Sequence, residues 1–516
     1  MMKESTASAN NRRIAKNTVM LYFRMIFLML VSLYTSRVIL NALGVEDYGI
    51  YNVVGGVVAM FGILSASLAS AISRFITFEL GRGDVEKLKR VFSTAVTIQI
   101  IISLIIVVLI EIIGVWFLNT HMVIPDNRMT AANWVLQLSV VTFVVNLISV
   151  PYNAAIIAHE RMSAFAYISI LEAVGKLAVA LLIVHSPIDR LIFYAILLTL
   201  IAVFIRLVYG WYCNKKFVEC HYRFRWDKGL LREMFGFAGW NFIGSSSALL
   251  RDQGGNIIIN LFFGPVVNAA RGISVQVNHA IIGFSDNFMM ALRPQIIKSY
   301  ASGDRSYMLT LVFQGARLSF YMLLILSVPV FMNTEYILTI WLKQFPDHTI
   351  NFIQLVLIFT LSESISNPLV TSMQATGKIR DYQLVVGGLQ MMNLPVAYLL
   401  LYLGYPPESV LITAIVISQI CLAARLLMLR LKIKLPVRTY LRKVYINVLI
   451  VGFISITLSW ACTRSISSGI WGFVLSCIIC VVLTVATEFF IGCSSAERRK
   501  VIAKSRSIIQ SRLIRR

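Results

Sequence analysis

The stretch LGVEDYGIYNVVGG, from Leu43 to Gly56, lies between two long apolar runs and combines two acidic residues with turn-forming glycines. Glycine adopts backbone angles that other residues avoid, so this composition predicts a tight connection between two helices. A second stretch, FGPVVNAARG from Phe263 to Gly272, lies between two other apolar runs. The sequence therefore predicts the same helical hairpin at two places in one chain.

An ungapped shift of 220 residues superposes the two stretches and the helices that flank them. The matching positions are Ile39 with Ile259, Gly44 with Gly264, Val57 with Val277, Ala71 with Ala291, Ile76 with Ile296, and Gly83-Asp84 with Gly303-Asp304. We predict an internal repeat of six helices, in which both copies have the same orientation because six is even. Two similar bundles around a central cavity suit alternating access, and a purely structural scaffold is the alternative.

The composition predicts an all-α integral membrane protein. Hydrophobic residues make up 58% of the 516 residues and charged residues only 14%. Apolar runs of about eighteen residues or more, the length that crosses a bilayer as a helix, recur along the chain. The predicted organisation is an N-terminal six-helix lobe, a C-terminal six-helix lobe, two further helices and a basic tail, at residues 1–232, 233–434, 435–493 and 494–516. The fourteen predicted transmembrane helices are 17–41, 50–73, 91–118, 132–158, 163–184, 190–214, 234–262, 266–292, 309–333, 350–375, 381–403, 408–430, 442–462 and 468–491.

The net charge of +23 has a distribution that identifies its origin. If the N-terminus lies inside, the inner segments hold 35 lysines and arginines and the outer loops hold four. This asymmetry follows the positive-inside rule and predicts that both termini are cytoplasmic. The charge is then a topology signal that also attracts anionic membrane lipid, and we expect no nucleic-acid partner. The C-x-x-C pair Cys477 and Cys480 has no companion ligands, so we predict no metal site.

Charged side chains at membrane depth are costly, so each requires a reason. Arg251 and Asp252 occur in SSSALLRDQGGN, the least lipid-like stretch of any predicted span. Because neighbours on a helix point about 100° apart, we expect that the two do not neutralise each other and that each finds a partner on another helix, water or a ligand. The Gly254-Gly255 pair favours local unwinding beside a cavity. A cavity role is the preferred interpretation, and a buried structural ion pair is the alternative.

Several other charged residues are candidates with a competing interpretation. Arg24 and Arg271 either line the cavity or extend to the membrane surface. Asp286 and Glu363 have no obvious local partner, and Glu363 precedes a kink expected at Pro368, so both are candidates for a coupling ion, H⁺ or Na⁺. Glu172 and Lys176 are spaced i, i+4 and predict a self-neutralising pair. His279 is expected to make a satisfied polar contact rather than to relay protons, and snorkelling to the cytoplasmic interface is favoured for Arg206, Arg317 and Arg425.

The sequence resembles a known family over its first hairpin. LGVEDYGIYNVVGGVVAMF followed by SRFITFELGRGDVEKLKRVFSTAV is similar to bacterial polysaccharide transporters, the O-antigen (Wzx-type) flippases. Their superfamily also includes lipid II flippases and multidrug/toxin extruders. The resemblance implies a two-lobed, fourteen-helix fold in the bacterial inner membrane that moves an undecaprenyl-pyrophosphate-linked oligosaccharide to the outer leaflet. It also implies association with glycan polymerase machinery and no cofactor beyond a coupling ion.

The resemblance implies arginines that face the cavity from helices 1, 2, 7 and 8. Arg24, Arg251 and Arg271 match helices 1, 7 and 8, and Asp252 lies beside the second of them. Helix 2 departs from this pattern, since only Arg74 at its cytoplasmic end is basic. A multidrug/toxin extrusion antiporter is the alternative within transport. A membrane-embedded polymerase or glycosyltransferase is the alternative among enzymes, but the loops are short and show no D-x-D motif or glycine-rich phosphate loop, so we expect no enzyme.

Overall fold

The computed structural model describes residues 2–59, 62–120, 124–224, 226–464, 466, 469–495, 497–499 and 502. Within these residues every regular element is a helix, which confirms the predicted all-α fold. In the same residues, eleven helices are long and apolar enough to cross a membrane. The predicted spans 50–73, 234–262 and 266–292 are helical where they are described but are not among the eleven, so the count of fourteen stays a prediction. Most of the predicted tail, 494–516, lies outside the described residues.

The chain forms two compact units. Unit 1 comprises residues 1–246, 290–308 and 373–383, and unit 2 comprises residues 247–289, 309–372 and 384–516. Helix α8 (Lys228–Ala301) contributes to both units. The lobes and the two extra helices predicted from the sequence remain predictions.

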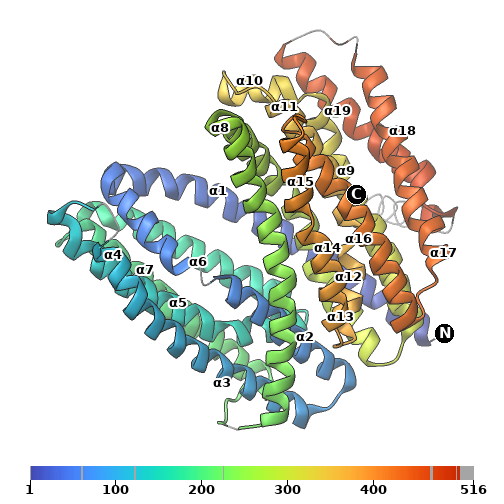
Figure 1. Ribbon diagram of the computed structural model, residues 1–516. Coiled ribbons are helices and arrows are strands. Elements are labelled where there is room, and N and C mark those ends of the chain that lie inside the picture. Colours follow the sequence, from blue (N-terminus) through green and yellow to red (C-terminus); the bar gives the residue numbers. More distant parts are fainter. Residues whose placement is uncertain are drawn as a thin grey trace, which may run out of the picture. The chain divides into compact units, whose positions relative to one another are not determined.

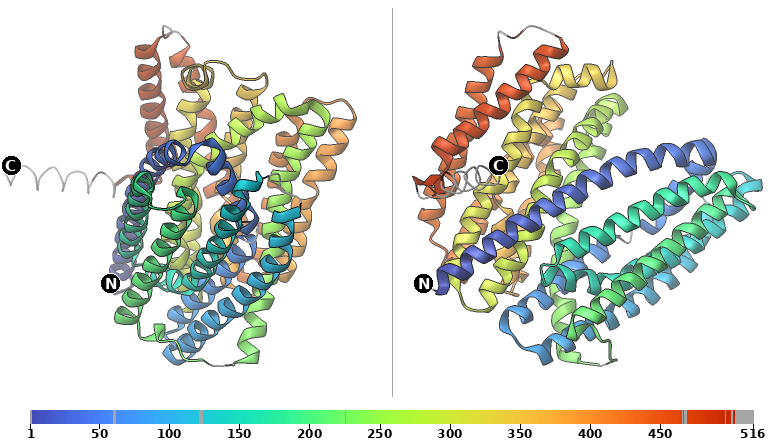
Figure 2. Two further views of the ribbon diagram at one scale, coloured as in Figure 1. Left: turned by 90° about the vertical axis from the view of Figure 1, so that its left-hand side faces the viewer. Right: turned by 180° about the vertical axis from the view of Figure 1, so that it is seen from behind.

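Unit 1 is a bundle of long helices. Helix α5 packs along α7, and α1 packs along α6 (Figures 1 and 2). Val54, Ala132, Val135 and Leu191 are fully buried in one of its apolar clusters. The elements that begin within this unit before α8 are α1 (Met2–Ala59), α2 (Gly62–Arg82), α3 (Val85–Leu109), a π turn (Ile110–Gly114), α4 (Val115–Thr120), α5 (Met129–Ala158), α6 (Met162–Leu182) and α7 (Arg190–Lys216), with single 3₁₀ turns at Asp126–Arg128, Ile183–His185 and Val218–Cys220.

Unit 2 is also helical, and α16 packs against both α11 and α15 while α18 packs against α19. The kink expected at Pro368 is present, because α11 ends at Ser364 and the next helix begins at Asn367. Apart from α8, the helices that lie wholly or mostly in this unit are α9 (Arg305–Met332), α10 (Thr334–Leu342), α11 (Thr349–Ser364), α12 (Asn367–Ala375), α14 (Gly388–Met391), α15 (Asn393–Tyr402), α16 (Ser409–Ile433), α17 (Val437–Tyr440), α18 (Ile446–Thr463) and α19 (Ile470–Thr487). Helix α13 (Arg380–Tyr382) belongs to unit 1, and π turns occur at Gln383–Gly387, Leu441–Tyr445 and Glu488–Gly492.

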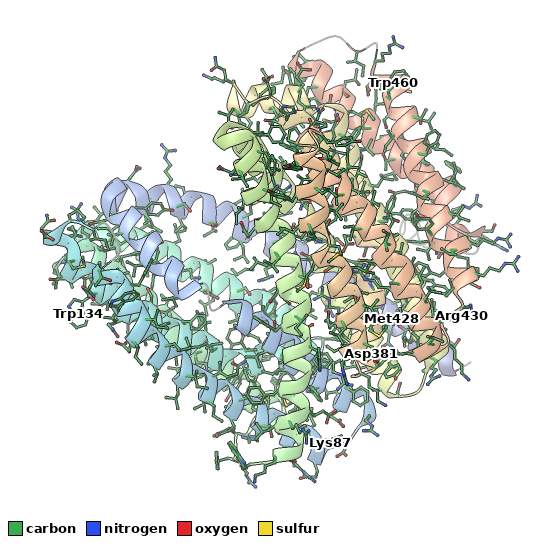
Figure 3. The ribbon with its side chains drawn as sticks, in the orientation of Figure 1. Lys87, Trp134, Asp381, Met428, Arg430 and Trp460 are labelled. Carbon is green, nitrogen blue, oxygen red and sulfur yellow. The ribbon has the colours of Figure 1, made fainter. Side chains whose placement is uncertain are left out.

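Both units carry exposed tryptophans of the kind that lie at a membrane–water interface. Trp134 on α5 is 55% exposed, and Trp460 on α18 is 54% exposed (Figure 3). Arg430 in the last turn of α16 is also exposed (Figure 3). Amphipathic rings and a terminal arginine suit helices that end where lipid headgroups begin.

The predicted duplication of the hairpin is visible in the backbone. Within α1, Gly44 has φ 80° and ψ 170°, and within α8, Gly264 has φ 76° and ψ −173°. This combination of angles is essentially restricted to glycine. In each case it turns one helical arm into the next, so the two glycines that match in sequence also match in conformation.

The loops after the hairpins match as well. Gly83 and Gly303 both adopt positive φ, at 78° and 79°. Asp84 accepts a hydrogen bond from the amide of Lys87 at 2.9 Å, and Asp304 accepts one from the amide of Tyr307 at 3.2 Å. Each aspartate therefore satisfies a free amide in the first turn of the helix that follows.

The first hairpin is held in unit 1 by an arginine from another helix. Arg128, just before α5, donates to both carboxylate oxygens of Asp47 at 2.8 and 2.6 Å. The same guanidinium donates to Asp189 at 2.5 Å, and Asp189 caps the first turn of α7. One fork of donors therefore joins the connection predicted from the sequence to the beginnings of two helices.

Candidate functional site

Unit 2 contains a cavity of about 420 Å³. Two arms of α8 line it, residues 249–258 and residues 271–286, and further walls come from α11, α15 and α16. Because Gly264 reverses the chain between the two arms, side chains that are about twenty residues apart in sequence face one space. The predicted residues Arg251, Asp252, Arg271, Asp286 and Glu363 all line this cavity.

Arg251 and Asp252 form an ion pair, which the sequence interpretation did not expect. The Nε of Arg251 lies 2.9 Å from Oδ1 of Asp252. The expectation was wrong because it considered only the directions of the Cα–Cβ bonds. The long arginine side chain bends toward the aspartate that follows it in the sequence. The guanidinium also lies over the ring of Phe359, 4.8 Å from its centroid. Asp252 remains 57% exposed, so this pair presents a carboxylate edge to the cavity.

The glycine pair of α8 does not unwind the helix. Gly254 and Gly255 lie in continuous helix, and the only non-helical residue described within α8 is Gly264. Because these glycines have no side chains, other side chains can approach the helix closely. A Cβ on Gly254 would lie 1.9 Å from the side chain of Leu394, and a Cβ on Gly255 would lie 3.0 Å from Nη2 of Arg271. The expected unwinding is wrong, and the pair instead makes room for neighbours, one of which is a cavity arginine.

Arg271 is the most buried charged residue of the cavity wall, at 5% exposure. Its Nε donates to Oδ1 of Asn256 at 2.6 Å, and its Nη2 lies 3.4 Å from the carbonyl oxygen of Asp252. Its Nη1 is buried without a hydrogen-bond partner. Among the described residues no carboxylate forms an ion pair with it. The guanidinium is thus anchored by neutral groups and has donor capacity left over.

Glu363 has a partner that the sequence did not reveal. Nη1 of Arg425, on α16, lies 3.7 Å from Oε1 of Glu363. Arg425 is only 3% exposed, so the expectation that it snorkels to an interface is wrong. Arg317 was also expected to snorkel, but it pairs with Glu497 and donates to the carbonyl of Gly492 at 3.3 Å. Both arginines therefore serve ion pairs within unit 2.

Amide, hydroxyl and imidazole side chains make up much of the rest of the cavity wall. There are ten of them: Gln253, Asn256, Ser274, Asn278, His279, Ser285, Thr360, Ser364, Asn367 and Asn393. Ligand pockets are usually lined mainly by apolar side chains with a few polar groups. A wall this rich in amides and hydroxyls suits a ligand that carries many hydroxyl or phosphate oxygens.

Arg24 lies in unit 1. Its guanidinium covers the ring of Phe165 on α6, 4.5 Å from the centroid, and its Nε is buried without a hydrogen-bond partner. The predicted pair Lys176–Glu172 is confirmed nearby on α6, at 2.6 Å. Arg206 is half-buried over the ring of Tyr152, 3.9 Å from the centroid.

Arg74 has more contacts than its place at the end of a predicted span suggested. It is 6% exposed in unit 1 and lies over the rings of Phe75 and Phe78 at 4.6 and 4.5 Å. It donates to the carbonyl of Ala375 at 3.2 Å, beside Gly377, whose φ is 74°. Sequence spacing gave no signal for this long-range contact.

A buried carboxylate in unit 1 was also missed. The side chain of Glu160, in the turn between α5 and α6, is fully buried. It pairs with Nε of Arg13 and Nζ of Lys298, both at 2.7 Å, and accepts from Gln295 at 2.5 Å. We call these four residues the Glu160 clasp. In the sequence, Arg13 and Lys298 contribute only to the excess of basic residues in the inner segments, since periodicity does not reveal contacts over such distances along the chain.

The chain is similar to a known protein family and to a bacterial membrane protein. Residues 14–299 match the family described as "Polysaccharide biosynthesis protein". The chain is 22% identical over 319 residues to the uncharacterized membrane protein EpsK of Bacillus subtilis strain 168, which covers 60% of this chain and 62% of EpsK. The chain therefore spans less than two thirds of that relative.

Solved structures with a similar fold are transporters. A MATE protein in complex with MaD3S superposes with a TM-score of 0.71 at 13% identity, covering 82% of this chain and 97% of that one. An outward-facing multidrug resistance MATE transporter of the MOP superfamily gives 0.70 at 13% identity, with 82% and 96% covered. A MOP superfamily transporter from Pyrococcus furiosus, described by the reverse polarity of its binding pocket, gives 0.66 at 13% identity, with 83% and 96% covered.

At such low identity these structures establish the fold alone. The family match covers more than half of the chain and includes both hairpins. This protein therefore belongs to the family of polysaccharide biosynthesis proteins and is a multi-pass, all-helical membrane protein with the fold of the MATE-like transporters.

Proposed function

We propose that this protein is a flippase that moves an undecaprenyl-pyrophosphate-linked oligosaccharide, an O-antigen or capsule repeat unit, across the bacterial inner membrane by alternating access. The family and the fold support a membrane flippase or exporter. The observation that carries the finer assignment is Arg271, a buried guanidinium without a carboxylate partner among the described residues, in a wall rich in neutral hydrogen-bonding groups.

The chemistry of a pyrophosphate headgroup fits this arrangement. Arginine presents several N–H donors in a planar fork that matches phosphate oxygens. Arg271 retains an unused Nη1, and Arg251 lies on the other arm of α8. Arg251 is already paired with Asp252, so binding an anion there requires that the aspartate share or release the guanidinium. In this proposal Arg271 is the primary anion contact, and Arg251 with Asp252 is an adjustable second contact.

The other proposed properties are ion coupling, the membrane topology and the neighbours of the protein. Asp286 and Glu363 are proposed to take up a coupling ion, H⁺ or Na⁺, with Arg425 competing for Glu363. The excess of lysine and arginine in the predicted inner segments supports cytoplasmic termini. The short loops support a transporter rather than an enzyme, and we propose the glycan polymerase machinery as a neighbour in the membrane.

A multidrug/toxin extrusion antiporter is the second candidate, and one observation favours it. The cavity wall contains three acids, and Asp252 remains 57% exposed, so a cationic compound would also find a partner. The two candidates differ in the residue that matters most, since an anionic substrate needs Arg271 and a cationic substrate needs the acids.

Deletion of the protein in its host tests the proposal. We expect undecaprenyl-linked repeat units to accumulate in the inner leaflet and surface glycan to be lost. Complementation with Arg271→Ala or Arg251→Ala is expected to restore less than about a tenth of the glycan, since hydrogen bonds to charged groups contribute about 1.5–3 kcal/mol each. Arg37→Ala, which changes an exposed arginine of α1, is the matched control and is expected to complement fully.

The alternative predicts a different result for the same strain. An unchanged pool of lipid-linked oligosaccharide together with new sensitivity to cationic compounds would assign the protein to extrusion. Full complementation by a membrane-inserted Arg271→Ala variant would remove the argument for an anionic headgroup.

A further inference from the structure

Unit 1 contains a second polar cavity, of about 330 Å³, between α2, α5, α6 and α7. Its polar wall consists of Ser65, Asn146, Ser149, Asn153, Glu172 and Tyr209. Among the described residues no lysine or arginine lines it, in contrast to the cavity of unit 2. Arg24 interacts electrostatically with Glu172 and Tyr209 of this wall but is not part of its lining.

Glu172, the one carboxylate among the described residues of this wall, is paired with a lysine. Oε1 of Glu172 lies 2.6 Å from Nζ of Lys176, one turn further along α6. A cationic ligand would have to compete with a partner on the same helix, which is always close by. The cavity therefore offers little to ligands of either charge and favours neutral groups that form hydrogen bonds.

Helix α5 presents its polar groups in a row. Asn146, Ser149 and Asn153 are spaced i, i+3 and i+7, which places them on one face over about 10 Å of helix. Oδ1 of Asn153 is buried without a hydrogen-bond partner. Pro151 has no N–H, so the carbonyl of Leu147, which also lines the cavity, loses its normal helical donor. Buried polar groups normally have partners, so the unused acceptor of Asn153 at this cavity points to a ligand that supplies a donor.

A sugar ring supplies such donors, because each hydroxyl both donates and accepts. We infer that this cavity binds uncharged saccharide of the transported lipid and so contributes to the choice of glycan. The inference rests on the proposed function, and it concerns the cavity of unit 1 alone. A site built to hydrogen-bond hydroxyls discriminates strongly against a ligand that lacks them.

Binding of two lipids to the purified full-length protein in detergent tests this assignment. The probes are undecaprenyl pyrophosphate without sugar and the undecaprenyl-pyrophosphate-linked oligosaccharide extracted from the host. We expect the wild-type protein to bind the glycosylated lipid more tightly. Asn153→Leu is expected to weaken binding of the glycosylated lipid about tenfold, because it removes hydrogen-bonding capacity from a desolvated site. Binding of the sugar-free lipid should be unchanged, which also shows that the variant is folded.

Asn133→Leu is the matched control, since it makes the same change on α5 outside this cavity. It is expected to leave both affinities unchanged, whereas Arg271→Ala is expected to weaken both. Wild-type affinity of Asn153→Leu for the glycosylated lipid, or an equal loss for both lipids, would overturn the sugar assignment while leaving the flippase proposal intact. If the wild-type protein binds neither lipid, the proposed function fails and this inference fails with it.

Discussion

The Glu160 clasp makes a quantitative prediction about stability. The carboxylate of Glu160 is fully buried and receives two cationic donors at 2.7 Å and one amide donor. Removing one partner of a buried ion pair costs about 3–5 kcal/mol because the remaining charge is left unpaired. The side chains of Arg13 and Lys298 are 48% and 24% exposed, so water recovers part of this cost. We therefore expect Glu160→Ala to lower the free energy of unfolding by about 3 kcal/mol, at the lower end of that range.

The backbone of Glu160 refines the prediction. Its φ of 59° lies in the left-handed region, where glycine avoids a cost of about 1–2 kcal/mol. Glu160→Gly should therefore be milder than Glu160→Ala, although both remove the same carboxylate. Denaturant titration in detergent micelles, followed by tryptophan fluorescence, gives the difference.

Glu86→Ala is the matched control for this series, because Glu86 is 65% exposed and its ion pair with Lys89 lies on the surface of α3. It should change the free energy of unfolding by less than about 0.5 kcal/mol. The account of the clasp would be refuted if Glu160→Ala also cost less than about 0.5 kcal/mol. It would also be refuted if the glycine variant were the less stable of the two.

Three further predictions concern the hairpins and the cavity. Gly44→Ala and Gly264→Ala should each lower the free energy of unfolding by about 1–3 kcal/mol, and clearly unequal costs in the same titration would argue against a shared backbone conformation. Gly255→Ala should reduce transport in the complementation assay without loss of membrane insertion, because its Cβ would lie 3.0 Å from the cavity guanidinium of Arg271, and wild-type transport would show that this guanidinium moves freely. Burial opposes ionisation of Asp189, but hydrogen bonds from Arg128 and from the first turn of α7 more than offset it and hold its pKa below the ordinary value of 3.8. Its contribution to stability should therefore be complete above about pH 4 and be lost as pH falls through the lower folded value, a loss that Asp189→Asn abolishes.

The sequence predicted much of the fold because the relevant signals are local. Long apolar runs define helices. A glycine at the same position in two matched segments of the chain marks a turn in each. Gly44 and Gly264 were matched by sequence shift alone, and the structure gives them the same angles. The kink at Pro368 was also predictable, since proline lacks the N–H that a continuous helix requires.

The sequence predicted which residues belong to the candidate site, but not which of them form ion pairs with one another. Five of the predicted residues line one cavity, because charges that interrupt an apolar helix must face something polar. The partner of each charge depends on side-chain reach and on distant helices, neither of which periodicity contains. This is why the pair Arg251–Asp252 and the contact between Glu363 and Arg425 were not foreseen.

The two hairpins show how a duplicated backbone acquires distinct chemistry. Under the 220-residue shift, Arg251, Asp252 and Arg271 correspond to Val31, Ser32 and Tyr51. Tyr51 makes an edge-to-face contact with a tyrosine of α7, so its position in unit 1 serves packing where the equivalent position in unit 2 carries a buried charge. Backbone geometry is shared, and function resides in the side chains placed on it. A duplicated scaffold that places arginines in the cavity wall of one copy, and aromatic packing at the matched position of the other, can give its two copies different chemistry.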